Sequence, residues 1–192
     1  MEQKYNTTTL GMELERLREY CEREGEAVTY LKGDRLEKEG EPAQWLAYVE
    51  SGCFKYVTRG VGDRRNHIAW FSFEGEFVVD YPSFLYGRPS QATIEAMMPS
   101  RVLRVSGENL KHFFGRSIET MELRAVIGEH LLGQFRSRYL ELHCATPRER
   151  YALLMQRCPG IVNELSLSAI ASFLNITPQL LSKIRKEITF KH

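Results

Sequence analysis

A segment near the carboxyl end of the chain places hydrogen-bonding side chains at the spacing of one helix face. Gln179, Ser182, Lys183 and Lys186 share a face of a helix that is predicted to begin at Pro178. A glutamine amide pairs bidentately with adenine, a lysine ammonium binds guanine or a phosphate, and a hydroxyl can make either contact. These residue types therefore predict recognition of a nucleic-acid duplex rather than covalent chemistry.

The residues before this helix suit a sharp turn between two packed helices. Ala171 offers the small side chain that close helix packing requires, and Asn175 tolerates the left-handed backbone that the turn needs. Thr177 is the predicted N-cap, because its hydroxyl can accept a bond from a first-turn amide and Pro178 has no amide to lose. Residues 165–186 thus predict a helix-turn-helix.

The second helix of this element also has an apolar face. Leu181, Ile184 and Ile188 recur three and four residues apart, which marks the side that packs on the first helix. The alternative is a small helical hairpin with an ordinary solvated face. The residues predicted to contact base edges are Gln179, Ser182 and Lys183. The residues predicted to contact phosphates are Thr177, Arg185 and Lys186, although Arg185 could instead cap the helix or pair with Glu187.

Composition allows a packed core and confines any basic surface to one end. The 192 residues are 43% hydrophobic, and the net charge is only +1. From Ser166 onward, however, four lysines and arginines stand against one acid, so this end is locally +3. A nucleic-acid footprint is therefore expected at the C-terminus.

Cysteine and histidine spacing argues against a metal site. The four cysteines include no CxxC pair, and the five histidines form neither HxH nor HExxH. We therefore expect free thiols, no metal, no cofactor and no catalytic group, which leaves little support for a cupin-like barrel enzyme. No apolar run reaches the length of a membrane span, and the N-terminus lacks the apolar core of a signal peptide, so a cytoplasmic protein without a membrane partner is expected.

The first two-thirds of the chain predict a short helix followed by a β-barrel. Residues 10–23 carry apolar side chains at helical spacing. Short β-rich runs follow, with glycines in the connections between them, at residues 27–31, 45–49, 54–58, 67–73, 92–97 and 102–105. Many short strands with glycine turns indicate a jelly-roll, and with the C-terminal helices they predict an α+β fold.

A proline-free run over residues 118–142 predicts one long helix with two apolar faces. The first face repeats every 3.5 residues, as a coiled-coil seam does. This predicted dimer seam comprises Ile118, Met121, Ala125, Gly128, Leu132, Phe135, Tyr139 and Leu142. A second stripe, Leu123, Ile127 and Leu131, is expected to pack on the barrel. The alternative is that both stripes are buried within one monomer.

After the long helix, Thr146 and Glu149 match a capping box with Pro147 between them. Three helices are predicted from there to the C-terminus, at residues 147–158, 167–174 and 178–188. The predicted domains are therefore a sensor barrel (residues 1–116), a dimerisation helix (117–143) and a helix-turn-helix domain (144–192).

Four short motifs in the barrel resemble the cyclic-nucleotide-binding barrel of the Crp/Fnr family of bacterial regulators. They are Lys32-Gly33-Asp34, Glu39-Gly40-Glu41-Pro42, residues 48–55 (YVESGCFK) and residues 73–77 (FEGEF). The order of barrel, long helix and DNA-binding element also fits the family, whose barrel is a double-stranded β-helix. Residues 170–186 look most like the short members common in Bacteroides-type bacteria, and no β-hairpin wing follows the reading helix before His192.

The resemblance also locates a candidate ligand site. In cyclic-AMP-binding members a Gly-Glu pair contacts the ribose, and an Arg-Ser or Arg-Thr pair before an alanine clamps the phosphate. The candidate ligand residues here are Gly75, Glu76, Phe77, Arg88, Ser90 and Gln91. Ser90 and Gln91 stand before Ala92 in place of that charged pair, and a neutral amide cannot grip a phosphate as an arginine fork does. We therefore expect an effector other than cyclic AMP, or a barrel filled by its own bulky residues, with Glu76 bonded to the barrel backbone.

The resulting hypothesis is a homodimeric transcription regulator that binds double-stranded DNA. The resemblance implies a small-molecule effector and RNA polymerase as further partners. The alternative hypothesis is a ligand-binding or protein-interaction module whose helix-turn-helix no longer binds DNA.

Overall fold

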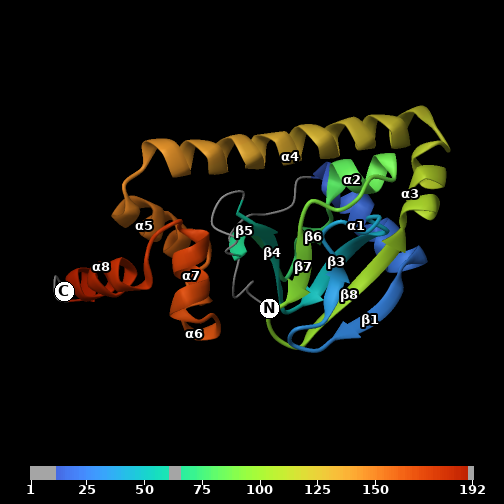
Figure 1. Cartoon of the computed structure of the whole chain (residues 1–192). Helices are drawn as coiled ribbons and strands as arrows, with labels where there is room; N and C mark the ends of the chain where they lie inside the picture. Colours follow the sequence, from blue (N-terminus) through green and yellow to red (C-terminus); the bar gives the residue numbers. More distant parts are fainter. Residues whose placement is uncertain (1–11, 61–65, 190–192) are drawn as a thin grey trace. The chain divides into compact units, whose positions relative to one another are not determined.

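The computed structural model describes residues 12–60 and 66–189 (Figure 1). Two compact units divide the chain, residues 9–132 and residues 133–192. The division falls inside the longest helix, α4 (Ile118–Cys144), between Leu132 and Gly133. We refer to them as the barrel unit and the C-terminal unit.

The barrel unit is built on two four-stranded antiparallel sheets. The first has the order β1 (Glu26–Tyr30), β8 (Ser100–Ser106), β3 (Trp45–Ser51) and β6 (Phe77–Val78). The second has the order β2 (Arg35–Glu37), β7 (Thr93–Ala96), β4 (Cys53–Arg59) and β5 (Asn66–Phe73). The predicted jelly-roll and the α+β class are confirmed, and β2 and β6 are short strands that the sequence did not reveal.

Apolar side chains fill the space between the two sheets. Val49, Phe54, Ile94 and Val102 are fully buried there, and Tyr30 packs edge-on against Phe54 with ring centroids 5.6 Å apart. Each such side chain contributes about 1.5–3 kcal/mol when it leaves water. The interior of the barrel is therefore packed with the chain's own residues.

A second core joins helices to the first sheet. Helix α1 (Met12–Glu24), α2 (Tyr81–Tyr86), α3 (Gly107–Phe114) and the start of α4 cover it. Leu123 and Ile127 of α4 are buried in this core and Leu131 packs against it, which confirms the predicted barrel-facing stripe. The predicted helix at residues 10–23 is confirmed from Met12, and Leu10 lies outside the described residues.

The C-terminal unit contains the end of α4 and four further helices. These are α5 (Pro147–Arg157), α6 (Ile161–Glu164), α7 (Leu167–Phe173) and α8 (Pro178–Thr189). The capping box is confirmed, since the Thr146 and Glu149 side chains each accept the other residue's backbone N–H. The predicted count of three helices is wrong, because Ile161 is fully buried and anchors the extra turn of α6.

A buried carboxylate at the end of β2 makes the stability of the folded barrel unit depend on pH. Glu37 is 6% exposed, and its Oε1 accepts the backbone N–H groups of Gln44 (2.8 Å) and Trp45 (2.7 Å). Desolvation raises the pKa of Glu37, and the two N–H groups only partly oppose it. The folded protein therefore holds this proton more tightly than the unfolded chain does.

We expect the stability of Glu37→Gln to depend less on pH between pH 4 and pH 7 than the stability of wild type does. Because the folded pKa is raised, the wild-type protein loses this stability as pH rises from the ordinary carboxyl range through the folded pKa. The melting temperatures of wild type and variant, measured from pH 4 to pH 7, should converge at the acid end and favour the variant at neutral pH. Glu39→Gln, at an exposed position, is the control; profiles that stay parallel for Glu37→Gln would contradict this account.

Candidate nucleic-acid interface

Helices α7 and α8 meet at the turn that the sequence predicted. Asn175 has φ 52° and is the one non-glycine residue with positive φ in the described chain. Its N–H donates to the Ser172 carbonyl, and the N–H of Ile176 donates to the Ala171 carbonyl, each at 3.0 Å. These bonds close α7 while the left-handed residue redirects the chain into α8.

The apolar face of α8 packs as expected at Leu181 and Ile184, whereas Ile188 is only half-buried. Leu181 is fully buried and Ile184 is 95% buried, while Ala171 of α7 and Leu174, the C-cap residue after it, are completely inaccessible. The Thr177 hydroxyl accepts the Leu180 N–H at 3.2 Å, which confirms the N-cap. Packing and capping together fix which face of α8 is left for solvent.

The predicted reading residues lie on the remaining face. Thr177, Gln179, Lys183 and Lys186 are exposed, whereas Ser182 and Arg185 are half-buried. Their DNA contacts stay predictions. Leu180, which was not predicted as a site residue, is 38% exposed in the first turn of α8. Its position outside the Leu181 and Ile184 stripe was the available signal, and an exposed apolar group there suits a thymine methyl.

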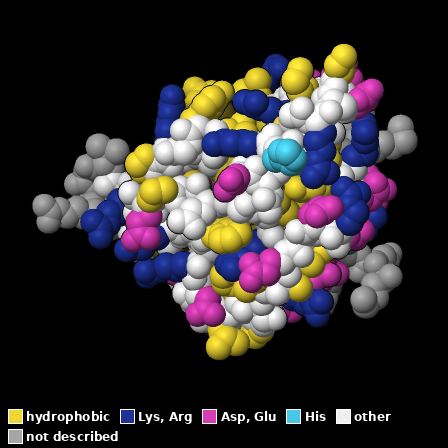
Figure 2. Space-filling view, turned by 90° about the vertical axis from the view of Figure 1, so that its right-hand side faces the viewer, with side chains coloured by type: hydrophobic (Ala, Val, Ile, Leu, Met, Phe, Trp, Pro, Cys, Tyr) yellow, Lys and Arg dark blue, Asp and Glu magenta, His cyan; other side chains and the backbone are white. Residues whose placement is uncertain are grey.

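Charge differs sharply between the two units. Residues 133–192 carry nine lysines and arginines against four acids, a net charge of +5, whereas residues 9–132 carry 16 against 20, a net charge of −4. Figure 2, which faces α3 and β1, shows basic and acidic side chains interspersed on that face. The chain's excess positive charge thus belongs to the unit that contains α8, as a polyanion-binding unit requires.

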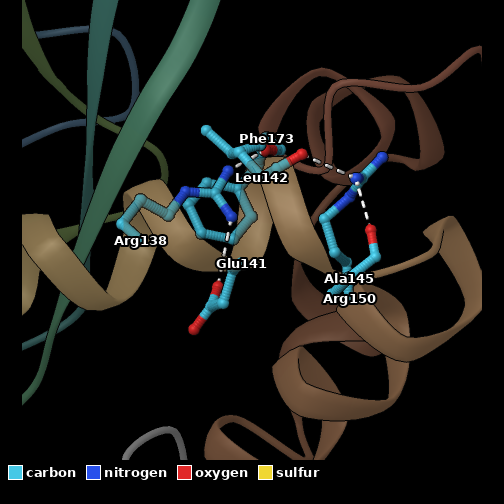
Figure 3. Close-up of polar contacts among 6 residues, drawn as sticks. All are labelled: Arg138, Glu141, Leu142, Ala145, Arg150 and Phe173. Carbon is cyan, nitrogen blue, oxygen red and sulfur yellow. Dashed lines mark hydrogen bonds and ion pairs between the residues drawn. The ribbon is translucent and has the colours of Figure 1, made fainter.

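Two arginines tie α4 to the helices that follow it (Figure 3). Arg138 of α4 donates through Nη2 to the Phe173 carbonyl at the end of α7, and its guanidinium lies 3.8 Å from the Phe173 ring centroid. Arg150 of α5 donates through Nη1 to the carbonyls of Leu142 (3.2 Å) and Ala145 (2.9 Å). Since the last carbonyls of a helix lack helical partners, Arg150 satisfies the end of α4 while Arg138 satisfies the end of α7.

Arg138 is 7% exposed, and desolvation lowers its pKa although Glu141, 3.4 Å away, opposes the shift. The side chain therefore holds its charge inside the unit at a cost that the Phe173 contacts must offset. This arrangement makes Arg138 a positioning residue for the α7–α8 element.

We expect Arg138→Ala to loosen that element. The variant leaves the Phe173 carbonyl without this donor, which costs about 1–3 kcal/mol for a buried acceptor. Hydrogen exchange of the α7 amides should then accelerate by roughly ten- to a hundredfold. Arg136→Ala, at an exposed position on the same helix, should leave exchange unchanged; equal effects of the two substitutions would show that Arg138 positions nothing.

The predicted dimer seam faces away from the chain's own core. Ile118, Leu132, Phe135 and Tyr139 are each more than 60% exposed. Met121 and Ala125 are exposed too, and Gly128 and Leu142 are half-buried. A Cβ placed on Gly128 would meet no atom within 4 Å, so the described chain itself does not require this glycine. An apolar stripe of this length that stays exposed marks an interaction surface.

The candidate ligand residues fall at two places in the barrel unit. Gly75, Glu76 and Phe77 form the turn from β5 into β6, where Glu76 Oε2 accepts the Phe73 N–H at 3.0 Å. The alternative role considered for Glu76, a bond to the barrel backbone, is therefore present. Arg88, Ser90 and Gln91 follow α2, and the exposed Arg88 guanidinium lies 5.2 Å from the Tyr86 ring centroid.

Ser90 and Gln91 are brought together with a residue that the sequence analysis did not single out. Asp80 Oδ2 lies 3.0 Å from Ser90 Oγ and accepts the Gln91 N–H at 2.7 Å. No cluster of metal-ligating side chains occurs within the described residues. No helix in that part of the chain combines the length and apolar character needed to cross a bilayer.

The geometry defines a jelly-roll barrel linked by a long helix to a helix-turn-helix unit. Residues 27–117 match the family model of the cyclic nucleotide-binding domain. Over these residues the chain is similar to that domain, and its fold matches that of Crp/Fnr-type transcription regulators, as the motifs indicated. The likeness to the short Bacteroides-type members stays a prediction.

Solved structures of bacterial regulators are similar to this chain in fold. FixK2 from Bradyrhizobium japonicum is 20% identical, with a TM-score of 0.73 over 87% of this chain and 85% of its own. The c-di-GMP-responsive regulator CLP from Xanthomonas campestris is 16% identical, with a TM-score of 0.66 over 93% and 92%. A CRP-family transcriptional regulator from Thermus thermophilus is 17% identical, with a TM-score of 0.65 over 85% of each chain. Comparison with curated protein sequences gives no match.

Proposed function

We propose that this protein is a homodimeric DNA-binding transcription regulator of the Crp/Fnr type. The observation that carries the proposal is the exposed polar face of α8, with Gln179, Lys183 and Lys186, on a unit whose net charge is +5. A helix of this kind fits the major groove, where amide and ammonium groups distinguish base edges. The candidate contacts remain Thr177, Gln179, Ser182, Lys183, Arg185 and Lys186.

The partner that covers the exposed seam of α4 is a second copy of the chain in this proposal. Parallel pairing of two α4 helices would bury Leu132 and Phe135 against their counterparts, as heptad seams do. Two copies of α8 would then enter successive major grooves about 34 Å apart on a pseudo-palindromic operator. The structural relatives have the same barrel and helical elements, which supports this arrangement.

Regulation in this proposal passes from the barrel to α8 through α4. A signal that binds one dimer geometry better than the other shifts the population of the two. The proposed domains are the sensor barrel (1–116), the dimerisation helix (117–143) and the DNA-binding domain (144–192). RNA polymerase is a further proposed partner, and the cytoplasm is the proposed site of action.

Selection of binding sites from a random duplex library tests the function. The purified full-length protein should enrich a palindromic sequence at low salt, and the enriched duplex should bind one dimer. Repeating the selection with a panel of cyclic nucleotides tests for an effector at the same time. A folded dimer that enriches no sequence would overturn the proposal and favour a protein-interaction module instead.

A further inference from the structure

Hydrogen-bond donors converge on single carboxylate oxygens at two places in the barrel unit. The Ser90 hydroxyl and the Gln91 N–H meet Asp80 Oδ2, and two backbone N–H groups meet Glu37 Oε1. Converging donors of this kind are what a protein uses to bind an anion. In both places the anion is a carboxylate of the chain itself.

The Ser90–Gln91 turn is held firmly. Ser90 is 3% exposed, its N–H donates to the Glu41 carbonyl at 2.7 Å, and its carbonyl accepts the Gly40 N–H at 2.9 Å. The Ser90 hydroxyl also lies 2.8 Å from the Ala92 carbonyl, so its single proton is shared between that oxygen and Asp80. The donors that face Asp80 are therefore fixed before any ligand arrives.

The Asp80 side chain accepts hydrogen bonds from this turn and not from its own helix, α2. It is the N-cap residue of α2, yet its side chain makes no capping bond there. An aspartate at this position usually accepts a first-turn N–H. The carboxylate instead reaches residues ten and eleven positions further along the chain, which links the start of α2 to the approach to β7.

The charges of the barrel unit also disfavour a bound anion. Its residues carry a net charge of −4. Lys55 pairs with Glu95 at 2.7 Å and Arg104 with Glu26 at 2.9 Å, while the Arg88 guanidinium lies over Tyr86. A ligand phosphate would therefore meet engaged donors and a neighbouring carboxylate.

We infer that Asp80 is an internal anion that occupies the phosphate-binding position of this cyclic nucleotide-binding domain and excludes phosphate-bearing ligands from it. A cyclic nucleotide needs donors or cations for its phosphate diester, and the buried Ser90 hydroxyl and the exposed Gln91 N–H are already bonded to Asp80. The residues present thus do not fit a cyclic nucleotide. This inference goes beyond the proposed function, since DNA binding by α8 does not depend on it.

Calorimetric titration of the full-length wild type and of Asp80→Ala tests the inference. The ligands are inorganic phosphate, cyclic AMP, cyclic GMP and cyclic di-GMP, at ionic strength matched with sodium chloride. Wild type should show no saturable binding of any of them. Asp80→Ala frees the Gln91 N–H, leaves the Ser90 hydroxyl with the Ala92 carbonyl as its one remaining acceptor, and removes the charge, so it should bind phosphate at least tenfold more tightly than wild type does.

Asp80→Asn shows whether the engaged donors or the negative charge exclude phosphate. Its amide oxygen can still accept both hydrogen bonds, but the side chain is neutral. It should resemble wild type in the phosphate titration. If Asp80→Ala does not fold, Asp80→Ser takes its place with the same expectation. Saturable binding of a cyclic nucleotide to wild type, or a folded alanine or serine variant that gains no phosphate affinity, would overturn the inference.

Discussion

Replacing Leu132 and Phe135 together by glutamate is expected to leave the protein monomeric and to abolish operator binding. The two side chains are 70% and 63% exposed on the seam of α4. In the proposed dimer the two copies bury four such side chains, and each loss would cost about 1.5–3 kcal/mol of burial free energy. The new carboxylates would also repel their counterparts on the partner helix. Dimer dissociation should therefore become at least a thousandfold more favourable.

Sedimentation equilibrium across micromolar concentrations measures this directly, and a gel-shift titration with the selected duplex gives the consequence for DNA. A monomer has one reading helix, so operator affinity should fall by about a thousandfold or more. Arg136→Glu makes an equally exposed change beside the seam and should leave most of the dimer intact. A double-glutamate variant that remains dimeric would place the interface elsewhere.

Lys183→Ala and Lys186→Ala are expected to weaken DNA binding in two different ways. Both lysines are exposed on α8, one turn apart. Lys183 is assigned to a base edge, so its loss should cost about 1–3 kcal/mol on the preferred operator and relax the choice of base at one position. Lys186 is assigned to a phosphate, so its loss should weaken all sequences alike and lower the salt slope by about one.

Titrations of the preferred and a scrambled duplex at several salt concentrations separate these outcomes. Lys111→Ala, exposed in the barrel unit, is the control and should change neither quantity. If the two α8 variants lose the same affinity on both duplexes, the division between base and phosphate contacts is incorrect.

The elements that sequence patterns predicted are those governed by local chemistry. Thr146 with Glu149, Thr177 and Asn175 act within a few residues of themselves, so their caps and turn could be identified from types and spacing. The apolar stripes of α4 and α8 repeat over several turns and gave equally clear signals. Helix α3 escaped notice although Ser106 caps it, because eight residues offer little periodicity.

The contacts that were missed join residues far apart in the chain. Strand β6 has only two residues and owes its conformation to pairing with β3. Arg138 reaches Phe173 across 35 positions, and Asp80 reaches Ser90 across ten. Nothing in the local sequence distinguishes these side chains from ordinary surface charges, since only the folded backbone determines which donor an isolated carboxylate or guanidinium meets.

The opposite net charges of the two units bear on how a duplex is first encountered. If the protein binds DNA as proposed, the polyanion would attract the C-terminal unit and repel the barrel unit, and collisions of the barrel with the phosphates would be short-lived. Early encounters with a duplex would therefore favour the C-terminal unit, which contains α8. Added salt would screen this attraction and slow the capture of the duplex, in addition to weakening the phosphate contacts of the bound state.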